Sequence, residues 1–191
     1  MGREAEIVST MLRFENAKKY KKQIKHLYET AFPKEERAPL FVLYYKTKDA
    51  KNNFYAVVDD DEFVGLSYTI QDKGMVYVFF LAIVEEKRGQ GYGSEVLSTL
   101  KDMYPDQVIT LMIEDTEDTA ADNYAQRINR LGFYKKNGFK QLHIHINEVG
   151  VEYELLGTET GITQAQFLSL MRNYIGGFLY KFIYRKTKLE E

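Results

Sequence analysis

Residues 75–103 read MVYVFFLAIVEEKRGQGYGSEVLSTLKDM, and this stretch says more about the fold than any other part of the chain. It begins with an apolar run, Met75 to Val84, that has the length and composition of a buried strand. A glycine-rich segment, residues 88–94, follows and leads into a helix whose apolar side chains recur at three- and four-residue steps until Pro105. A buried strand, a glycine-rich turn and an amphipathic helix in direct succession indicate an α/β fold.

The glycine-rich segment has the chemistry of an anion site. Glycines allow a tight turn and let a ligand approach the main-chain amides without a Cβ in the way. The helix start adds unpaired N–H groups and the positive end of the helix dipole, so phosphate is the ligand that such a segment favours. Ser94-Glu95 does not match the Lys-Ser/Thr pair of a nucleotide P-loop, and the spacing to Gly93 does not match a dinucleotide fingerprint. From the glycines alone, a tight connection without a ligand fits equally well.

Hydrophobic periodicity predicts the remaining elements. An antiparallel meander should precede the strand at residue 75, and strands and helices should alternate after it, which is typical of a mixed sheet with helices on both faces. Segment 40–45 is either a short helix or extended. The other expected elements are helices over about 20–31 and 123–137, with Ile128, Leu131 and Tyr134 or Tyr124 facing inward, and strands over 54–58, 63–70, 108–113, 140–146 and 149–156.

Two regions are expected, residues 1–156 and a C-terminal extension over 157–191. In the extension, Thr163 and Gln166 form a capping-box pattern at the start of a helix. Gly176-Gly177 should end that helix, and Phe178 to Tyr184 reads as a terminal strand. The extension is apolar enough to cover a sheet face or to form a homodimer interface.

The composition excludes several classes of protein. The 26 basic and 28 acidic residues leave a formal charge of −2, which provides no electrostatic footprint for nucleic acid. The absence of cysteine excludes disulfides, thiolate metal sites and a cysteine nucleophile. His143 and His145 lack a third ligand, so no metal is expected. No apolar run is long enough for a membrane span and no signal peptide is evident, so we expect a cytoplasmic protein without a membrane partner.

Two sequence signatures together resemble the GNAT superfamily of N-acetyltransferases. The coenzyme A motif of that family is Arg or Gln, two residues, Gly, one residue, then Gly or Ala, and it is matched by Arg88, Gly91 and Gly93 after the apolar strand. The second signature appears downstream as residues 133–139, FYKKNGF. The resemblance covers roughly residues 10–156. It implies a mixed, mostly antiparallel splayed sheet and acetyl-CoA as cosubstrate.

The resemblance also implies roles for particular residues. The main chain at the end of the apolar strand would pair with the pantetheine arm like an extra strand, and the amides of the following turn would hold the pyrophosphate. A helix over 123–137 would approach the coenzyme, although exposed helix arginines are the commoner outcome. The residues implied in cofactor binding are Leu81, Ala82, Ile83, Arg88, Gly89, Gln90, Gly91, Tyr92, Gly93, Ser94, Asn123 and Arg127.

Two catalytic candidates follow from the same resemblance. Tyr134 matches the tyrosine that lies near the coenzyme sulfur in the family. Proton transfer from a phenol of pKa ~10 to a thiolate of pKa ~8.5 is unfavourable by about 2 kcal/mol. Tyr134 would therefore mainly hydrogen-bond the leaving thiolate. Glu114 is the first choice for the general base that a protonated amine acceptor requires. A packed core tyrosine and a solvated strand-end glutamate are the structural alternatives. Glu35, Glu36 and Arg37 lie in the loop that borders the acceptor pocket in the family, where acidic groups would attract a cationic amine; a solvated surface loop is the commoner alternative.

The function predicted from the sequence is acetyl transfer from acetyl-CoA to a primary amine by direct attack. The acceptor, a small molecule or a peptide, is not encoded in any motif. A non-catalytic acyl-CoA-binding or sensory module is the main alternative, since it would keep the phosphate loop and lack a working base. Binding of another nucleotide at the glycine-rich loop is a third reading.

Overall fold

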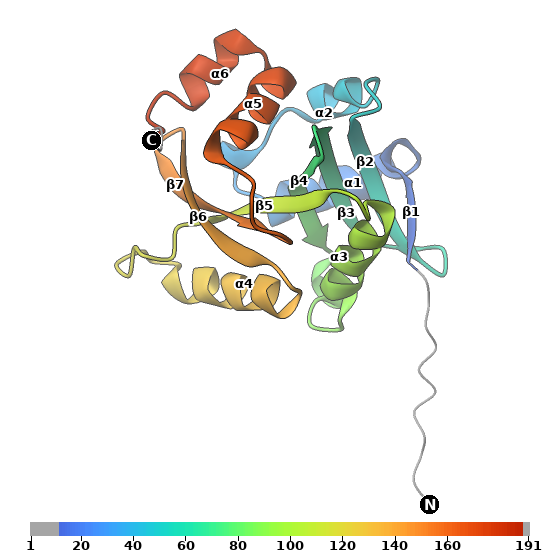
Figure 1. Ribbon diagram of the computed structural model, residues 1–191. Helices are drawn as coiled ribbons and strands as arrows, with labels where there is room; N and C mark the ends of the chain where they lie inside the picture. The colour runs from blue at the N-terminus through green and yellow to red at the C-terminus, as the bar shows by residue number, and fades with distance from the viewer. Residues whose placement is uncertain (1–11, 189–191) are drawn as a thin grey trace, which may run out of the picture.

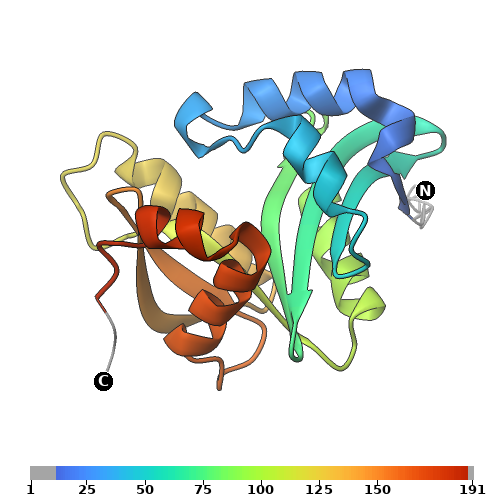
Figure 2. The ribbon, with the colours of Figure 1, turned by 90° about the horizontal axis from the view of Figure 1, so that it is seen from above.

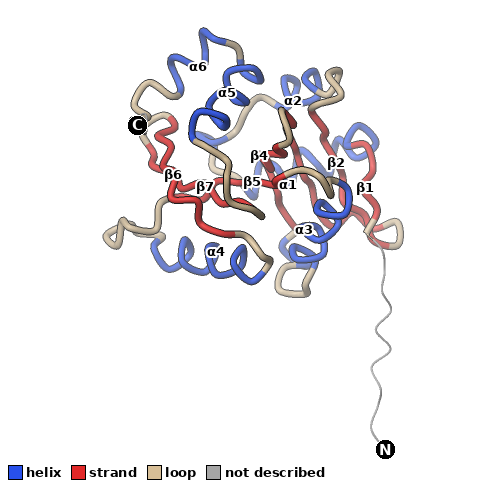
Figure 3. The backbone as a smooth tube through the Cα atoms, viewed as in Figure 1, coloured by secondary structure: helices blue, strands red, loops and turns tan. Residues whose placement is uncertain are grey.

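A seven-stranded sheet runs through the centre of the protein in the order β1-β2-β3-β4-β5-β7-β6 (Figure 1). The computed structural model describes residues 12–188. Helices lie on both sides of the sheet, as the tube in Figure 3 shows. The strands are β1 Arg13–Asn16, β2 Asn52–Asp59, β3 Glu62–Asp72, β4 Met75–Ile83, β5 Val108–Glu114, β6 Lys140–Glu148 and β7 Val151–Gly157; the helices are α1 Lys21–Ala31, α2 Leu40–Lys46, α3 Tyr92–Met103, α4 Tyr124–Lys136, α5 Gln164–Ile175 and α6 Gly177–Ile183.

The predicted mixed α/β architecture is confirmed. Neighbouring strands pair antiparallel except β4 and β5, which pair parallel around the α3 crossover. The ambiguous segment after Pro39 is helical. Three short 3-10 helices, η1 Ala17–Tyr20, η2 Lys34–Glu36 and η3 Glu85–Lys87, complete the chain. The edge strand β1 was not predicted, because four residues are too short to show a period of two.

The sheet separates two apolar layers. On one side, side chains of α1, α2 and α5 pack on Tyr68, Tyr77 and Leu155 from the strands. On the other side, side chains of α3 and α4 pack on a second set that includes Val76 and Ile113. Period-two alternation along each strand sends neighbouring residues to opposite layers. Ile128 does not belong to either layer: it is 40% exposed, so its predicted inward orientation is wrong, and Leu131 provides the buried contact of α4 instead.

The pairing of β4 with β5 is short. It includes only Met75–Tyr77 against Val108–Thr110, whereas β4 continues to Ile83 and β5 to Glu114. Beyond Tyr77 the two strands therefore diverge, and Figure 2 shows the β1–β4 part and the β5–β7–β6 part standing apart. A register shift of the β3–β4 ladder, between Tyr68 and Thr69, inserts an extra residue opposite this divergence. Such a bulge bends its strand and increases the local twist.

After the end of β7, the C-terminal extension contains two helices, α5 and α6, joined to β7 by a loop. A capping box at Thr163 and Gln166 starts α5, as predicted. The predicted terminal strand over Phe178 to Tyr184 is wrong, because these residues form α6 and the turn after it. Their apolar side chains recur four residues apart, a spacing that suits a helix as well as a strand-like run. Within residues 12–188, no helix is long and apolar enough to cross a bilayer.

Candidate active site

The glycine-rich turn after β4 presents a row of main-chain amides. Gly89 and Gly91 have φ of 73° and 95°, a region that favours glycine, and Gly91 caps the start of α3. Within the described residues, the amides from Gly89 to Gly93 donate to no backbone carbonyl, while Ser94 and Glu95 donate to Gly91 at 2.9 and 3.1 Å. Unpaired amides at the positive end of a twelve-residue helix provide hydrogen-bond donors that favour an anion.

Side chains around this turn hold its shape and leave its amides open. Arg88 Nε donates to the carbonyl of Ile83 at 3.1 Å, which ties the turn to the end of β4. Gln90 Nε2 donates to the carbonyl of Glu86 at 2.7 Å. Tyr92 Oη donates to Asp59 Oδ2 at 2.7 Å, and this contact raises the pKa of the tyrosine. A Cβ on Gly93 would lie 3.0 Å from Phe133 Cζ, so that glycine allows α3 to approach α4.

The facing edges of β4 and β5 are the second component of the site. The other edge of β4 pairs with β3 and that of β5 pairs with β7, so only the edges that face each other carry free N–H and C=O groups. On β4 these groups belong to alternate residues between 78 and 83, a stretch that contains Leu81, Ala82 and Ile83, and the carbonyl of Ile83 already accepts from Arg88. An extended molecule with amide groups can pair with such an edge as an added strand.

Tyr134 lies on α4 next to this opening. Its ring contacts Phe133 and Phe139 edge-on, with centroids 5.2 and 5.7 Å away, and it packs on the layer under α3 and α4. Burial raises the pKa of its phenol, and the charge of Arg130 lowers it in part. Tyr134 also acts electrostatically on Tyr77, the last β4 residue that pairs with β5. Its phenol is therefore protonated at neutral pH and lies near the point where the strands diverge.

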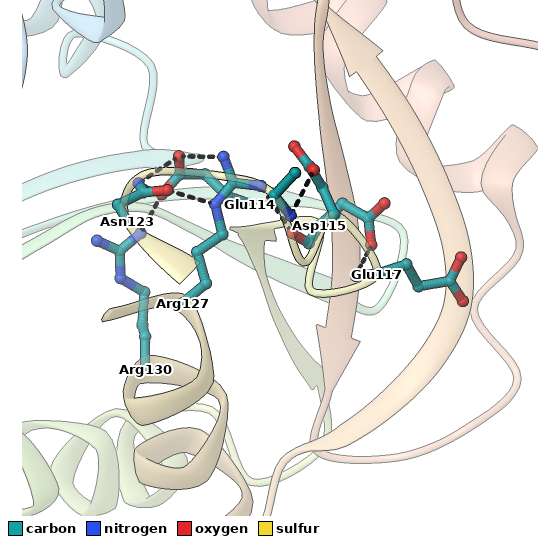
Figure 4. Close-up of polar contacts among 8 residues, drawn as sticks. Glu114, Asp115, Glu117, Asn123, Arg127 and Arg130 are labelled. Atoms are coloured by element: carbon teal, nitrogen blue, oxygen red, sulfur yellow. Dashed lines mark hydrogen bonds and ion pairs between the residues drawn. The ribbon is translucent and has the colours of Figure 1, made fainter. Parts of the chain in front are cut away.

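Glu114 is held in a cluster of polar groups at the junction of β5 and α4 (Figure 4). Asn123 Nδ2 donates to both carboxylate oxygens at 2.9 and 3.1 Å. Arg127 and Arg130 each form an ion pair with the carboxylate at 3.2 Å, and only 13% of the Glu114 side chain is exposed. Arg127 also donates to Asn123 Oδ1 at 2.7 Å and to the carbonyl of Asp115 at 2.8 Å. The carboxylate of Glu114 is thus already bound by two guanidinium groups and one side-chain amide.

The predicted site residues consequently form two groups. Residues from Leu81 to Ser94 lie together along the end of β4 and the start of α3. Asn123 and Arg127, expected at the coenzyme, lie together with Glu114, and their part in cofactor binding stays a prediction. A third set was missed from the sequence: Tyr77, Glu148 and Tyr184 approach one another from β4, β6 and the C-terminal extension. Within residues 12–188, no group of three His, Cys, Asp or Glu could hold a metal.

The chain belongs to the acetyltransferase (GNAT) family, whose sequence profile matches residues 21–139, more than half of the protein. It is therefore an enzyme of the acetyltransferase class. The match includes the glycine-rich turn, the diverging strands β4 and β5, and Tyr134; it ends before β6, β7 and the C-terminal helices.

Solved structures with the same fold include GNAT enzymes bound to coenzyme A. A protein from Bacteroides thetaiotaomicron, described as an acetyltransferase from the GNAT family, is 18% identical with a TM-score of 0.69 over 88% of this chain and 97% of its own. An aminoglycoside 6'-N-acetyltransferase complexed with coenzyme A is 18% identical, with a TM-score of 0.61 over 76% and 94% of the two chains. Naa50 of Arabidopsis thaliana, in complex with the bisubstrate analogue CoA-Ac-MVNAL, is 21% identical, with a TM-score of 0.58 over 78% and 99%. Comparison with curated protein sequences gives no significant match.

Proposed function

We propose that this protein transfers the acetyl group of acetyl-CoA to a primary amine by direct attack of the amine on the thioester. Acceptors of both kinds, small molecules and peptides, fit the proposal. A cytoplasmic location and the lack of nucleic-acid and membrane partners remain predictions from the sequence.

One observation carries the proposal: the open amides of the turn at Gly89 to Gly93 follow the free edge of β4 with only the short helix η3 between them. Coenzyme A combines a pyrophosphate with an extended arm that contains two amide groups. The turn offers donors to the phosphates, and the strand edge offers backbone partners to the arm. The thioester at the end of the arm would then lie between the diverging strands, next to Tyr134.

Tyr134 is proposed to hydrogen-bond the departing sulfur. A phenol whose pKa is raised by burial is a poor proton donor to a thiolate, but it keeps its O–H available throughout the reaction. A hydrogen bond to the developing negative charge stabilises the transition state more than the ground state. A main-chain N–H of the β4 edge near Leu81 would do the same for the carbonyl oxygen.

The reaction needs no covalent enzyme intermediate. The acceptor loses a proton to a base, its nitrogen lone pair forms the C–N bond, and the C–S bond breaks to release coenzyme A as a thiolate. This thiolate leaves with the remaining extra proton of the nitrogen, so the products are the neutral amide and the thiol of coenzyme A. The enzyme contributes the orientation of two substrates and the stabilisation of two negative charges.

Release of free thiol from acetyl-CoA in the presence of a panel of primary amines tests the proposal. The panel should contain an aminoglycoside, a polyamine, free lysine and short peptides. In the wild-type protein at least one amine should release thiol, and Tyr134→Phe should lower kcat for that amine by about 10- to 100-fold, because one donor to developing charge is lost. Acetyl-CoA affinity, measured by calorimetry, should change less than threefold.

The same assay can reject the proposal. Tight binding of acetyl-CoA without turnover of any amine would favour the non-catalytic acyl-CoA-binding module. Equal losses of turnover and coenzyme affinity in Tyr134→Phe would show that the tyrosine only packs in the core. Tyr124→Phe, on the first turn of the same helix, is the matched control.

A further inference from the structure

A carboxylate that forms no ion pair with any described residue lies at the end of β6. The side chain of Glu148 faces the same side of the sheet as Ile144 and Ile146, toward the layer covered by α1, α2 and α5. It is partly buried, and its Oε2 accepts a hydrogen bond from Tyr184 Oη at 3.1 Å. Within residues 12–188, no Lys, Arg or His lies within ion-pair distance of it. Burial raises the pKa of this carboxyl, and the charge of Glu36 adds to the effect.

Groups from four other parts of the chain lie within electrostatic reach of Glu148. Tyr77 comes from β4, Tyr153 from β7, Tyr184 from the turn after α6, and Glu36 from η2. Burial raises the pKa of all three tyrosines, and the negative charge of Glu148 adds to this effect, so the three phenols lie within electrostatic reach of its carboxylate. The charge of Glu36 also contributes to the raised pKa of Tyr77 and of Tyr153. The loop after α1 and the β6–β7 hairpin therefore border one polar region.

Tyr77 connects this region to the thioester site. It is the last residue of β4 that pairs with β5, so it lies at the start of the divergence between the two strands. Burial raises the pKa of Tyr77, and two charged or polar groups add to this effect. Tyr134 does so from the layer under α3 and α4, and Glu148 does so from the opposite side of the sheet. An acetyl group at the opening would have Tyr134 on one side and Glu148 on the other. An amine that approaches from the side of η2 and the β6–β7 hairpin would meet the carboxylate first.

Glu114 and Glu148 differ in what already occupies them. The oxygens of Glu114 accept from Asn123, Arg127 and Arg130, so an incoming ammonium would have to displace an existing donor. The one hydrogen bond to the carboxylate of Glu148 within the described residues is from a neutral phenol. A carboxylate in such surroundings is the better partner for a cationic amine and the better acceptor of its proton.

We propose that Glu148, oriented by Tyr184, is the general base that deprotonates the acceptor amine. The inference rests on the proposed amine acetylation. The Glu148 carboxylate binds the acceptor as R–NH₃⁺ and takes one proton from it. The neutral nitrogen then attacks the thioester carbon; the C–N bond forms, the C–S bond breaks, and the thiolate leaves with a proton from the nitrogen. Glu148 finally returns its proton to solvent.

The C-terminal extension becomes part of the catalytic site in this mechanism. Besides Tyr184, it holds the β6–β7 hairpin through the main chain of Ile183, whose carbonyl accepts from Val149 N at 3.1 Å. Thr187 Oγ1 adds two contacts to the main chain of Asn147, at 3.1 and 2.9 Å. These residues lie outside the range matched by the family profile.

Four variants test the proposal. Glu148→Gln removes the base, Tyr184→Phe removes its hydrogen bond, and Glu114→Gln removes the alternative carboxylate. Glu152→Gln is the matched control, because it lies on the same hairpin, is exposed, and can still accept from Asn147 through its amide oxygen. Each variant is assayed with the best primary amine of the panel and with its β-fluorinated analogue, whose nitrogen is less basic. Acetyl-CoA affinity by calorimetry shows whether each variant is folded.

Glu148→Gln should lower kcat/KM by about 100-fold or more at unchanged coenzyme affinity, and Tyr184→Phe by about tenfold. The defect of Glu148→Gln should shrink with the fluorinated amine, since an acceptor that is already neutral needs no base. Two results would overturn the assignment of Glu148 as the base and leave amine acetylation intact. One is a Glu148→Gln defect of equal size for both amines, and the other is a defect that shrinks with the fluorinated amine only in Glu114→Gln. A wild-type protein that acetylates no amine would instead refute the proposed function itself.

Discussion

Substitution of Gly91 by glutamate and by glutamine separates the effect of charge at the proposed phosphate site from the effect of loop shape. Gly91 has φ of 95°, and a Cβ built on it would meet no atom within 4 Å. Either side chain therefore has room, and both variants carry the same backbone penalty of about 1–2 kcal/mol for an L-residue in this region. The two variants differ only in one negative charge beside the open amides.

The expected size of the charge effect follows from Coulomb's law. Two unit charges about 5 Å apart at an effective dielectric constant of about 20 repel by about 3 kcal/mol. Counter-ions and the exposure of the loop reduce this value. We expect coenzyme A to bind Gly91→Glu about 10- to 100-fold more weakly than Gly91→Gln, which corresponds to about 1.4–2.8 kcal/mol.

Calorimetric titration with coenzyme A and with pantetheine, at low and at high salt, measures the effect. Pantetheine has no pyrophosphate, so its affinity should be the same in the two variants. The difference for coenzyme A should shrink at high salt. Equal coenzyme A affinity in the two variants, or an equal difference for pantetheine, would refute the placement of the pyrophosphate on this turn.

Two further predictions concern stability. Gly65→Ala should lower the free energy of unfolding by about 1–3 kcal/mol, because its Cβ would lie 2.6 Å from the carbonyl oxygen of Ala82 and 2.9 Å from Ile83 Cδ1. Gly132→Ala, where a Cβ meets nothing within 4 Å, should not destabilise in the same thermal melt and is the control. Burial raises the pKa of Glu148, so its contribution to stability is present below the ordinary carboxyl pKa of about 4.3 and is lost as pH rises through the folded-state value. Glu148→Gln should therefore gain stability relative to wild type between pH 4 and pH 8 in denaturant titrations, and a constant difference would contradict the buried carboxylate.

The sequence was most informative where a function depends on consecutive residues. The strand from Met75, the glycine-rich turn and helix α3 were predicted because apolar periodicity, glycine and a helix start are local properties. The family signature rests on the same segment, and the profile match at residues 21–139 confirms it. Where the local pattern was ambiguous, as in residues 178–184, a run of apolar residues was assigned to a strand although it forms a helix.

Only the tertiary structure decided which side chains meet at the site. No spacing rule indicates that Glu114 is enclosed by Arg127 and Arg130, because the β5–α4 connection sets the approach of that helix. Tyr184 and Glu148 lie 36 positions apart, and they touch because α6 docks on the β6–β7 hairpin. The opening between β4 and β5 likewise depends on where two strands stop pairing. Backbone conformation follows from neighbouring residues, whereas the surroundings of a carboxylate follow from packing between distant segments, and those surroundings determine what the carboxylate can bind.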